Sequence, residues 1–232
     1  RQLLIKDWLS SFLSLLFPRC CVVCGRPLAK GEECICTVCN INLPRTNYHL
    51  RKDNPVERLF WGQIPLERAT SFFFYEKGSD FRLILHRLKY GGQKEIGAIM
   101  GRYMAAELLS SHFFQGIDVI IPIPLHKKKQ QIRGYNQSEW IARGIAAVTG
   151  IPIDTESILR KKNTETQTRK SVFERRDNVE GIFELQHPET LTGKHILIVD
   201  DVLTTGSTTL ACASCLVNVE GIRISILTLA TA

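Results

Sequence analysis

Two kinds of hydrophobic pattern alternate along most of this chain: short apolar runs, and longer segments with apolar residues three or four positions apart. The short runs predict β-strands at residues 69–75, 119–121, 181–185, 196–199 and 222–229. The longer segments predict helices at residues 84–88, 96–108, 134–145 and 209–217. Such alternation is typical of an α/β domain in which helices flank a parallel sheet.

The most informative strand runs from Ile196 to Val199, four consecutive large apolar residues that suit a strand buried on both faces of the sheet. Asp200 and Asp201 follow at its carboxyl end. Two neighbouring carboxylates repel each other and lose solvation, so we expect them to face a diol, a metal or a cation.

A hydroxyl-rich loop follows the acid pair. It consists of Thr204, Thr205, Gly206, Ser207 and Thr208. At the start of a helix, its backbone N–H groups and hydroxyls form a cradle for a phosphate. A diol-binding acid pair beside a phosphate cradle describes a ribose 5-phosphate site.

Two other interpretations compete with this one. An acid-capped strand followed by a threonine-rich helix cap would leave the acid pair without a partner. A response-regulator receiver domain has a similar pair on its first strand and needs roughly a hundred further residues to complete a domain. We expect neither: the first leaves the pair unexplained, and the second does not suit a pair that is followed only by residues up to Ala232.

Six of the eight cysteines lie between Cys20 and Cys39, and four of them form two C-x-x-C pairs with eleven residues between the pairs. This spacing predicts a closed tetrahedral zinc site, which is structural rather than catalytic. The predicted ligands are Cys21, Cys24, Cys36 and Cys39. We expect the remaining cysteines to be unliganded: Cys20 and Cys34 lie outside the C-x-x-C spacing, whereas Cys212 and Cys215 lie in a predicted helix.

Two basic segments flank the predicted site. The first contains Lys127, Lys128, Lys129 and Arg133, which we expect in a loop at the carboxyl edge that Asp200 shares. It is a candidate for binding pyrophosphate or another polyanion, although a solvated basic loop is the alternative. The second segment, residues 160–178, is long and polar and is a candidate lid over a charged substrate.

Length and charge limit the organisation of the 232-residue chain. We expect an N-terminal helix and zinc module at residues 1–44, a linker at 45–68 and the α/β domain at 69–232. The net charge of +7 favours anionic partners, and the clustered cysteines suit metal binding in a reducing cytoplasm. The apolar residues 1–17 are interrupted by Lys6 and Asp7 and are too short for a membrane span.

The acid-pair loop resembles the phosphoribosyl-pyrophosphate loop of type I phosphoribosyltransferases. Several stretches together are similar to the ComF family of competence-associated phosphoribosyltransferase-like proteins. They are the double C-x-x-C, Lys89-Tyr90-Gly91, residues 133–137, Gln167 with Arg175 and Asn178, and the acid-pair loop. The resemblance implies a zinc finger joined to a type I phosphoribosyltransferase fold, and a role in handling incoming single-stranded DNA during natural transformation.

The resemblance also implies roles for individual residues. Asp200 and Asp201 would hold the ribose hydroxyls as catalytic residues, and Thr204 to Thr208 would wrap the 5-phosphate. Magnesium would accompany phosphoribosyl pyrophosphate. Further substrate-binding residues would be Lys127, Lys128, Arg133, Gln167 and Arg175.

Three functions remain open at this point. The chain is a phosphoribosyltransferase, or a non-catalytic module that binds nucleic acid or senses a nucleotide, or a zinc-finger protein that binds DNA-processing partners and carries a vestigial enzyme domain. In purine-salvage relatives an acid opens the phosphate loop and assists the incoming base, whereas this chain has Thr204 there. The acceptor substrate is therefore not predicted.

Overall fold

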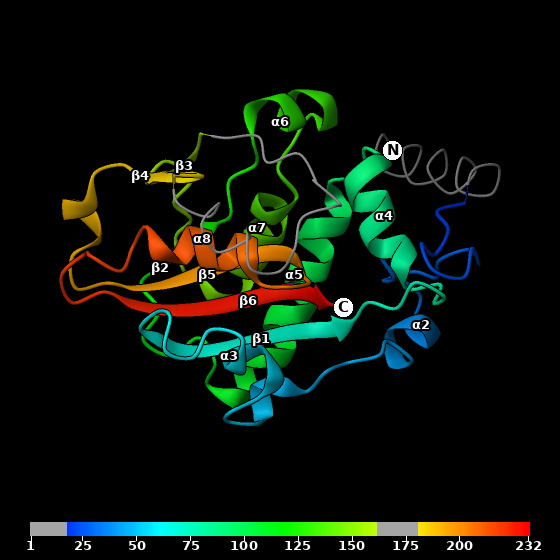
Figure 1. Cartoon of the computed structure of the whole chain (residues 1–232). Coiled ribbons are helices and arrows are strands. Elements are labelled where there is room, and N and C mark those ends of the chain that lie inside the picture. Colours follow the sequence, from blue (N-terminus) through cyan, green and yellow to red (C-terminus); the bar gives the residue numbers. More distant parts are fainter. Residues whose placement is uncertain (1–17, 162–180) are drawn as a thin grey trace, which may run out of the picture.

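The computed structural model describes residues 18–161 and 181–232 (Figure 1). The N-terminal segment 1–17 and residues 162–178 of the candidate lid, with Gln167, Arg175 and Asn178, lie outside the described residues. The strands are β1 (Leu66–Phe74), β2 (Val119–Pro122), β3 (Ile158–Arg160), β4 (Phe183–Leu185), β5 (His195–Leu203) and β6 (Arg223–Thr231). The helices are α2 (Thr37–Ile41), η1 (Tyr48–Leu50), α3 (Pro55–Arg58), α4 (Arg82–Tyr90), α5 (Glu95–Leu108), η2 (Leu109–Ser111), α6 (Lys127–Arg133), α7 (Gln137–Thr149), η4 (Pro188–Leu191) and α8 (Ser207–Ser214).

A four-stranded parallel sheet in the order β1-β6-β5-β2 forms the centre of the fold. Helices cover both of its faces, and Figure 1 shows α5 passing behind the strands and α8 in front of them. A parallel sheet requires such crossover helices, since each strand must return to the same end before the next begins. The predicted parallel sheet flanked by helices is confirmed.

The central strand β5 is buried on both faces. Leu197 and Val199 belong to one apolar cluster with residues of α4, α5 and α7, whereas Ile196 and Ile198 belong to a second cluster with residues of α8. All four side chains are fully buried. Because successive side chains of a strand point to opposite faces, an unbroken apolar run predicts this two-sided burial correctly.

Strand β5 is longer than its apolar run. Asp200 pairs with Thr228 of β6, and Val202 pairs with Ala230. The acid pair therefore lies within the last residue pairs of the β5–β6 ladder rather than after the strand. Helix α8 correspondingly begins at Ser207, two residues earlier than predicted. Strand β1 likewise begins earlier than predicted, at Leu66.

The basic residues Lys127 to Arg133 form helix α6, where a loop was predicted. The His126 side chain accepts a hydrogen bond from the Lys128 N–H, and Gly134 ends the helix at a φ of 81°. These two caps define a helix that lacks an apolar stripe. A second correction concerns β4, which pairs antiparallel with β3 and stands outside the main sheet.

The cysteine-rich module and the α/β domain share one apolar core. Val22 and Ile35 of the module lie in the same cluster as Met104 of α5. An ion pair between Glu33 of the module and Arg102 of α5 joins the two parts. The module is thus packed onto α5.

Helices α5 and α7 cross at very short range. A Cβ atom added to Gly144 would lie 2.1 Å from the Ala98 carbonyl oxygen, and one added to Gly101 would lie 2.3 Å from the Ile141 carbonyl oxygen. Only glycine allows backbones to approach this closely. The crossing connects the module side of the fold to α7, whose first turn reaches the acid pair.

No helix within the described parts of the chain is both long enough and apolar enough to cross a membrane.

Candidate functional site

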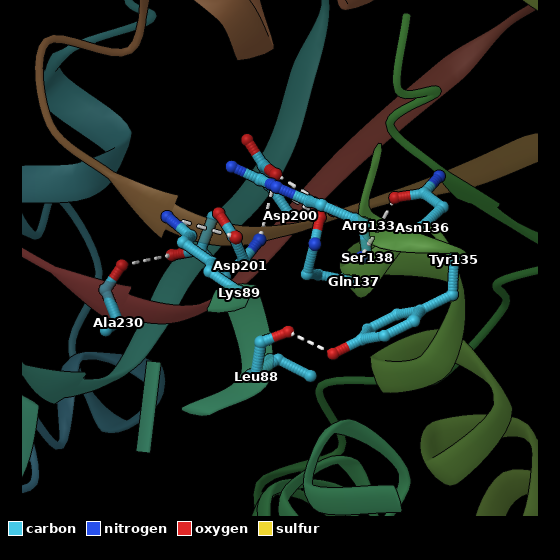
Figure 2. A network of polar contacts seen from close by, with 11 residues as sticks. Leu88, Lys89, Arg133, Tyr135, Asn136, Gln137, Ser138, Asp200, Asp201 and Ala230 are labelled. Carbon is cyan, nitrogen blue, oxygen red and sulfur yellow. Dashed lines mark hydrogen bonds and ion pairs between the residues drawn. The ribbon is translucent and has the colours of Figure 1, made fainter. Parts of the chain in front are cut away.

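Asp200 and Asp201 lie near the carboxyl end of β5, where segments distant in sequence meet (Figure 2). The Asp200 Oδ1 atom accepts hydrogen bonds from the Ser138 hydroxyl at 3.0 Å and from the Asp201 backbone N–H at 2.8 Å. Asp201 is 8% exposed, and its Oδ2 atom lies 3.1 Å from the Lys89 ammonium. Neither Lys89 nor Ser138 was predicted as a site residue.

The electrostatics of this pair favour a cationic or hydroxyl-bearing ligand. Burial and the neighbouring Asp201 charge raise the pKa of Asp200 to about 7, against the opposing effects of the Asp201 N–H, the Ser138 hydroxyl and Lys89. One ammonium therefore does not fully compensate two adjacent carboxylates. Added positive charge or hydroxyl donors at the pair would stabilise its ionised form.

The first turn of α7 is held in place from both sides. Asn136 accepts a hydrogen bond from the Ser138 N–H at 3.2 Å and donates to the Ile123 carbonyl at 3.0 Å, which ties the helix start to the end of β2. The Tyr135 hydroxyl donates to the Leu88 carbonyl at 2.6 Å, next to Lys89. These contacts fix Ser138 and Lys89 relative to the acid pair.

The predicted phosphate loop is open to solvent. Thr204, Thr205 and Thr208 are exposed, and the hydroxyls of Thr205 and Ser207 lie 2.9 Å apart. Among the described residues no side chain caps the N-terminus of α8. Gly206 has a φ of 75°, and an added Cβ would contact the Phe60 ring at 3.4 Å. The loop thus presents N–H groups and hydroxyls that a bound anion would satisfy.

A pocket of about 560 Å³ opens at the carboxyl end of β2. Arg160 lines it and feels the Asp200 charge, which opposes the lowering of the arginine pKa by burial. Arg160 therefore belongs both to the pocket wall and to the electrostatic surroundings of Asp200. Its other walls come from the start of α6 and from β3 and β4, and they include Pro124, His126, Lys127, Glu139, Leu159 and Glu184.

The predicted basic residues separate into different surroundings. Lys127 lines the pocket, whereas Lys128 is exposed on α6. Arg133, at the other end of α6, lies 5.4 Å from the Tyr90 ring centre and donates to the Gln137 Oε1 atom at 3.0 Å, beside the acid pair in Figure 2. Arg133 therefore lies beside the acid pair, and the phosphate loop follows that pair directly along the chain.

The four predicted cysteine ligands converge. The Sγ atoms of Cys21, Cys24, Cys36 and Cys39 all lie within 4.8 Å of one another. The Cys24 and Cys36 sulfurs are 3.7 Å apart, close to the edge of a zinc–thiolate tetrahedron with bonds of about 2.3 Å. The cluster fits a structural zinc site.

Backbone donors prepare this cluster for a cation. Burial opposes ionisation of Cys21, but hydrogen bonds from the backbone N–H groups of Cys24 and Cys36 lower the pKa of this thiol to about 7. The effect is specific to Cys21, since burial raises the pKa of Cys39 within the cluster and of Cys34 outside it. Cys20 is exposed and also lies outside the cluster.

Comparisons with known proteins identify the family of this chain. Residues 137–232 match the family described as "Phosphoribosyl transferase domain". The chain is 32% identical over 209 residues to "DNA utilization protein YhgH" of Escherichia coli O157:H7, an alignment covering 84% of this chain and 88% of that protein. It is 26% identical over 214 residues to "Competence protein ComFC" of Bacillus subtilis, covering 90% and 82%. It is 32% identical over 130 residues to "Competence protein F" of Haemophilus influenzae, covering 54% and 57%. The chain belongs to the ComF family of competence-associated proteins with a phosphoribosyltransferase fold.

Proposed function

We propose that this protein binds phosphoribosyl pyrophosphate or a related ribose 5-phosphate and acts in the handling of DNA during competence. The observation that carries the proposal is the Asp200–Asp201 pair, which is held at the sheet edge beside an uncapped helix N-terminus. The names of the relatives support the proposed role in DNA handling, since they are described as DNA utilization and competence proteins.

Within this proposal the site divides into two parts. The carboxylates of Asp200 and Asp201 accept hydrogen bonds from the two ribose hydroxyls. The N–H groups of Ser207 and Thr208, with the loop hydroxyls, surround the 5-phosphate. Ligand binding would reduce the repulsion between the two carboxylates, because the ribose hydroxyls donate hydrogen bonds to them. It would also give the N–H groups at the start of α8 an acceptor.

The acid pair and the pyrophosphate end of the ligand together suit magnesium, a hard cation that prefers oxygen ligands. When bound, magnesium would neutralise charge on the pyrophosphate group. The residues of this chain that serve the same end are Lys127 and Arg133, which place positive charge next to the carboxyl edge. In the cysteine cluster, four thiolates fill the coordination sphere of zinc, which makes that site structural.

Catalysis would be displacement of pyrophosphate from C1 of the ribose. As pyrophosphate departs, positive charge develops on the sugar ring and negative charge on the pyrophosphate. Basic side chains would stabilise the negative charge on the pyrophosphate. The chain places Thr204 at the start of the loop, where a hydroxyl is a poor general base at neutral pH. We therefore propose ligand binding as the function of this site and leave base transfer out of the proposal.

A second candidate function is binding of single-stranded nucleic acid at the same edge. The observation that favours it is the surface of α6, where Lys127 and Lys128 are exposed and Arg133 stacks on Tyr90, itself 69% exposed. Cations beside an exposed ring are the elements of single-strand binding. Affinity should then fall steeply with salt and with neutralisation of these lysines.

Isothermal titration calorimetry with phosphoribosyl pyrophosphate and magnesium tests the first candidate. We expect saturable binding to the wild-type protein and a loss of at least about a hundred-fold in the Asp200→Asn, Asp201→Asn double variant, because both diol acceptors change their charge. Glu220→Gln, an exposed acid beyond α8, is the matched control and should bind like the wild type. Equal affinity of the double variant and the wild type would refute the proposal.

A further inference from the structure

Lys89 places a fixed positive charge at the acid pair. Its ammonium lies 3.1 Å from the Asp201 Oδ2 atom, and the two side chains are only 21% and 12% exposed. In Figure 2 Lys89 reaches the pair from α4, whereas Ser138 reaches it from α7. Because solvent screens a partly buried ion pair less than an exposed one, this contact is stronger than an ordinary surface ion pair.

The end of α4 determines the position of this ammonium. The preceding residue, Leu88, is fully buried, and its carbonyl accepts a hydrogen bond from the Tyr135 hydroxyl at 2.6 Å. Two residues after Lys89, Gly91 ends the helix, and a Cβ atom added there would lie 2.8 Å from the Arg87 carbonyl oxygen. Only glycine allows the chain to leave the helix this closely. The Lys89 backbone is therefore held on both sides.

Each carboxylate of the acid pair uses one oxygen on the protein and keeps the other. Asp200 Oδ1 accepts hydrogen bonds from Ser138 and from the next backbone N–H, and Asp201 Oδ2 contacts the Lys89 ammonium. In the described part of the chain, neither Asp200 Oδ2 nor Asp201 Oδ1 has a hydrogen bond or an ion pair. A ribose diol has two hydroxyl donors. One oxygen from each carboxylate can thus accept them while Lys89 stays in place.

We propose that Lys89 is the resident counter-cation of the acid pair and allows the pair to bind a ribose diol without a divalent metal ion. The inference rests on the proposed function and concerns how that site recognises the sugar. The ammonium reduces the repulsion between the two carboxylates, and also the repulsion between the pair and the 5-phosphate of the ligand. Magnesium then serves the pyrophosphate group of phosphoribosyl pyrophosphate rather than the sugar.

Lys89 acts through Asp201, so it is a positioning residue. Its contact with Oδ2 holds the Asp201 carboxylate in one orientation and leaves Oδ1 available. Without the ammonium, the two carboxylates repel each other and the Asp201 side chain is free to turn away. A magnesium ion at the pair would then replace the missing charge, since carboxylate oxygens are ligands that it accepts.

Isothermal titration calorimetry with ribose 5-phosphate, in EDTA or in magnesium, tests the inference. This ligand carries the diol and the 5-phosphate but no pyrophosphate. We expect the wild type to bind it with affinities that differ by less than about two-fold between the two conditions. Lys89→Met keeps the length of the side chain and removes its charge. Its affinity should fall about ten-fold or more in EDTA, as for loss of a hydrogen bond between charged groups, and magnesium should restore most of this loss.

Two further variants separate the charge of Lys89 from its packing. Lys89→Arg keeps a cation at this position and should still bind ribose 5-phosphate in EDTA. Lys52→Met makes the same chemical change as Lys89→Met at an exposed position before β1, and it should bind like the wild type in both conditions. Melting temperatures establish that each variant is folded. Loss of structure lowers affinity equally with and without magnesium, so the difference between the two conditions reports on the charge.

The possible results distinguish this inference from the proposed function. A wild type that binds phosphoribosyl pyrophosphate with magnesium, but does not bind ribose 5-phosphate in EDTA, overturns the inference and leaves the proposed function standing. A Lys89→Met variant that binds like the wild type in EDTA, or that loses the same affinity in both conditions, also overturns it. If the wild type binds neither ligand in either condition, the proposed function fails and the inference fails with it.

Discussion

The cysteine cluster and the acid pair both gather groups that repel one another when ionised, yet they are built in opposite ways. All four sulfurs come from residues 21–39, and backbone N–H groups of Cys24 and Cys36 stabilise the Cys21 thiolate. The partners of the acid pair come from far away, with Ser138 62 residues before Asp200. A local site can be recognised from spacing, whereas a long-range site reveals only its most distinctive segment.

The two regions also differ in what they leave open. A zinc ion in the cluster would be enclosed by four thiolates, with no position for a substrate. At the acid pair, the pKa of Asp200 is raised, and the uncapped start of α8 follows a few residues later. The first region therefore stabilises the fold, and the second has unfilled binding capacity.

Removing a cysteine ligand should produce the largest effect. Cys36→Ser breaks the tetrahedral set in a module that shares its core with α5, so we expect zinc content to fall from one equivalent to near zero. The free energy of unfolding should drop by more than about 5 kcal/mol, since metal binding contributes directly to folding. Elemental analysis and thermal denaturation measure the two quantities.

The matched control is Cys20→Ser, an exposed cysteine next to the cluster. It should retain zinc and melt like the wild type. Equal loss of metal in both variants would mean that the C-x-x-C spacing does not define the ligands.

A substitution at the α5–α7 crossing tests whether the packing of the cysteine-rich module on α5 affects the acid pair through α7. In Gly144→Ala the new methyl group would lie 2.1 Å from the Ala98 carbonyl oxygen, so the helices must move apart. We expect a loss of about 3 kcal/mol in stability, together with weaker ligand binding as α7 carries Ser138 away from Asp200. Gly78→Ala, with no atom within 4 Å of the added Cβ, should change neither. Unaltered binding in a destabilised Gly144→Ala variant would separate the crossing from the site.

The smallest effect concerns pH. An unfolded aspartic acid ionises near pH 4, whereas folded Asp200 has a pKa of about 7 because of burial and the Asp201 charge. Folding thus takes up a proton between these values, and the wild type loses stability as the pH rises from about 4 to about 7. Asp200→Asn has no such proton, so its stability should rise relative to that of the wild type over this range and change little above it. Melting temperatures of both proteins at pH 5, 6, 7 and 8 measure the difference, and a constant difference would contradict the raised pKa.

The sequence predicted those parts of the fold whose signal is contiguous. The unbroken apolar run at Ile196 to Val199 fixed a buried central strand, and the C-x-x-C spacing identified all four cysteines of the cluster. Helix α6 was missed because its polar residues show no periodicity, and its formation depends on the His126 and Gly134 caps. Lys89 belongs to the Lys89-Tyr90-Gly91 stretch that resembles the family, but no neighbouring residue in the sequence indicated that its side chain would contact Asp201.

The most direct test of the ribose-phosphate site is a crystal structure of the protein with phosphoribosyl pyrophosphate and magnesium. We expect the 5-phosphate at the N–H groups of Thr204 to Thr208 and both ribose hydroxyls within hydrogen-bond distance of Asp200 and Asp201. A ligand bound elsewhere, with the acid pair still occupied only by Lys89 and Ser138, would contradict this assignment.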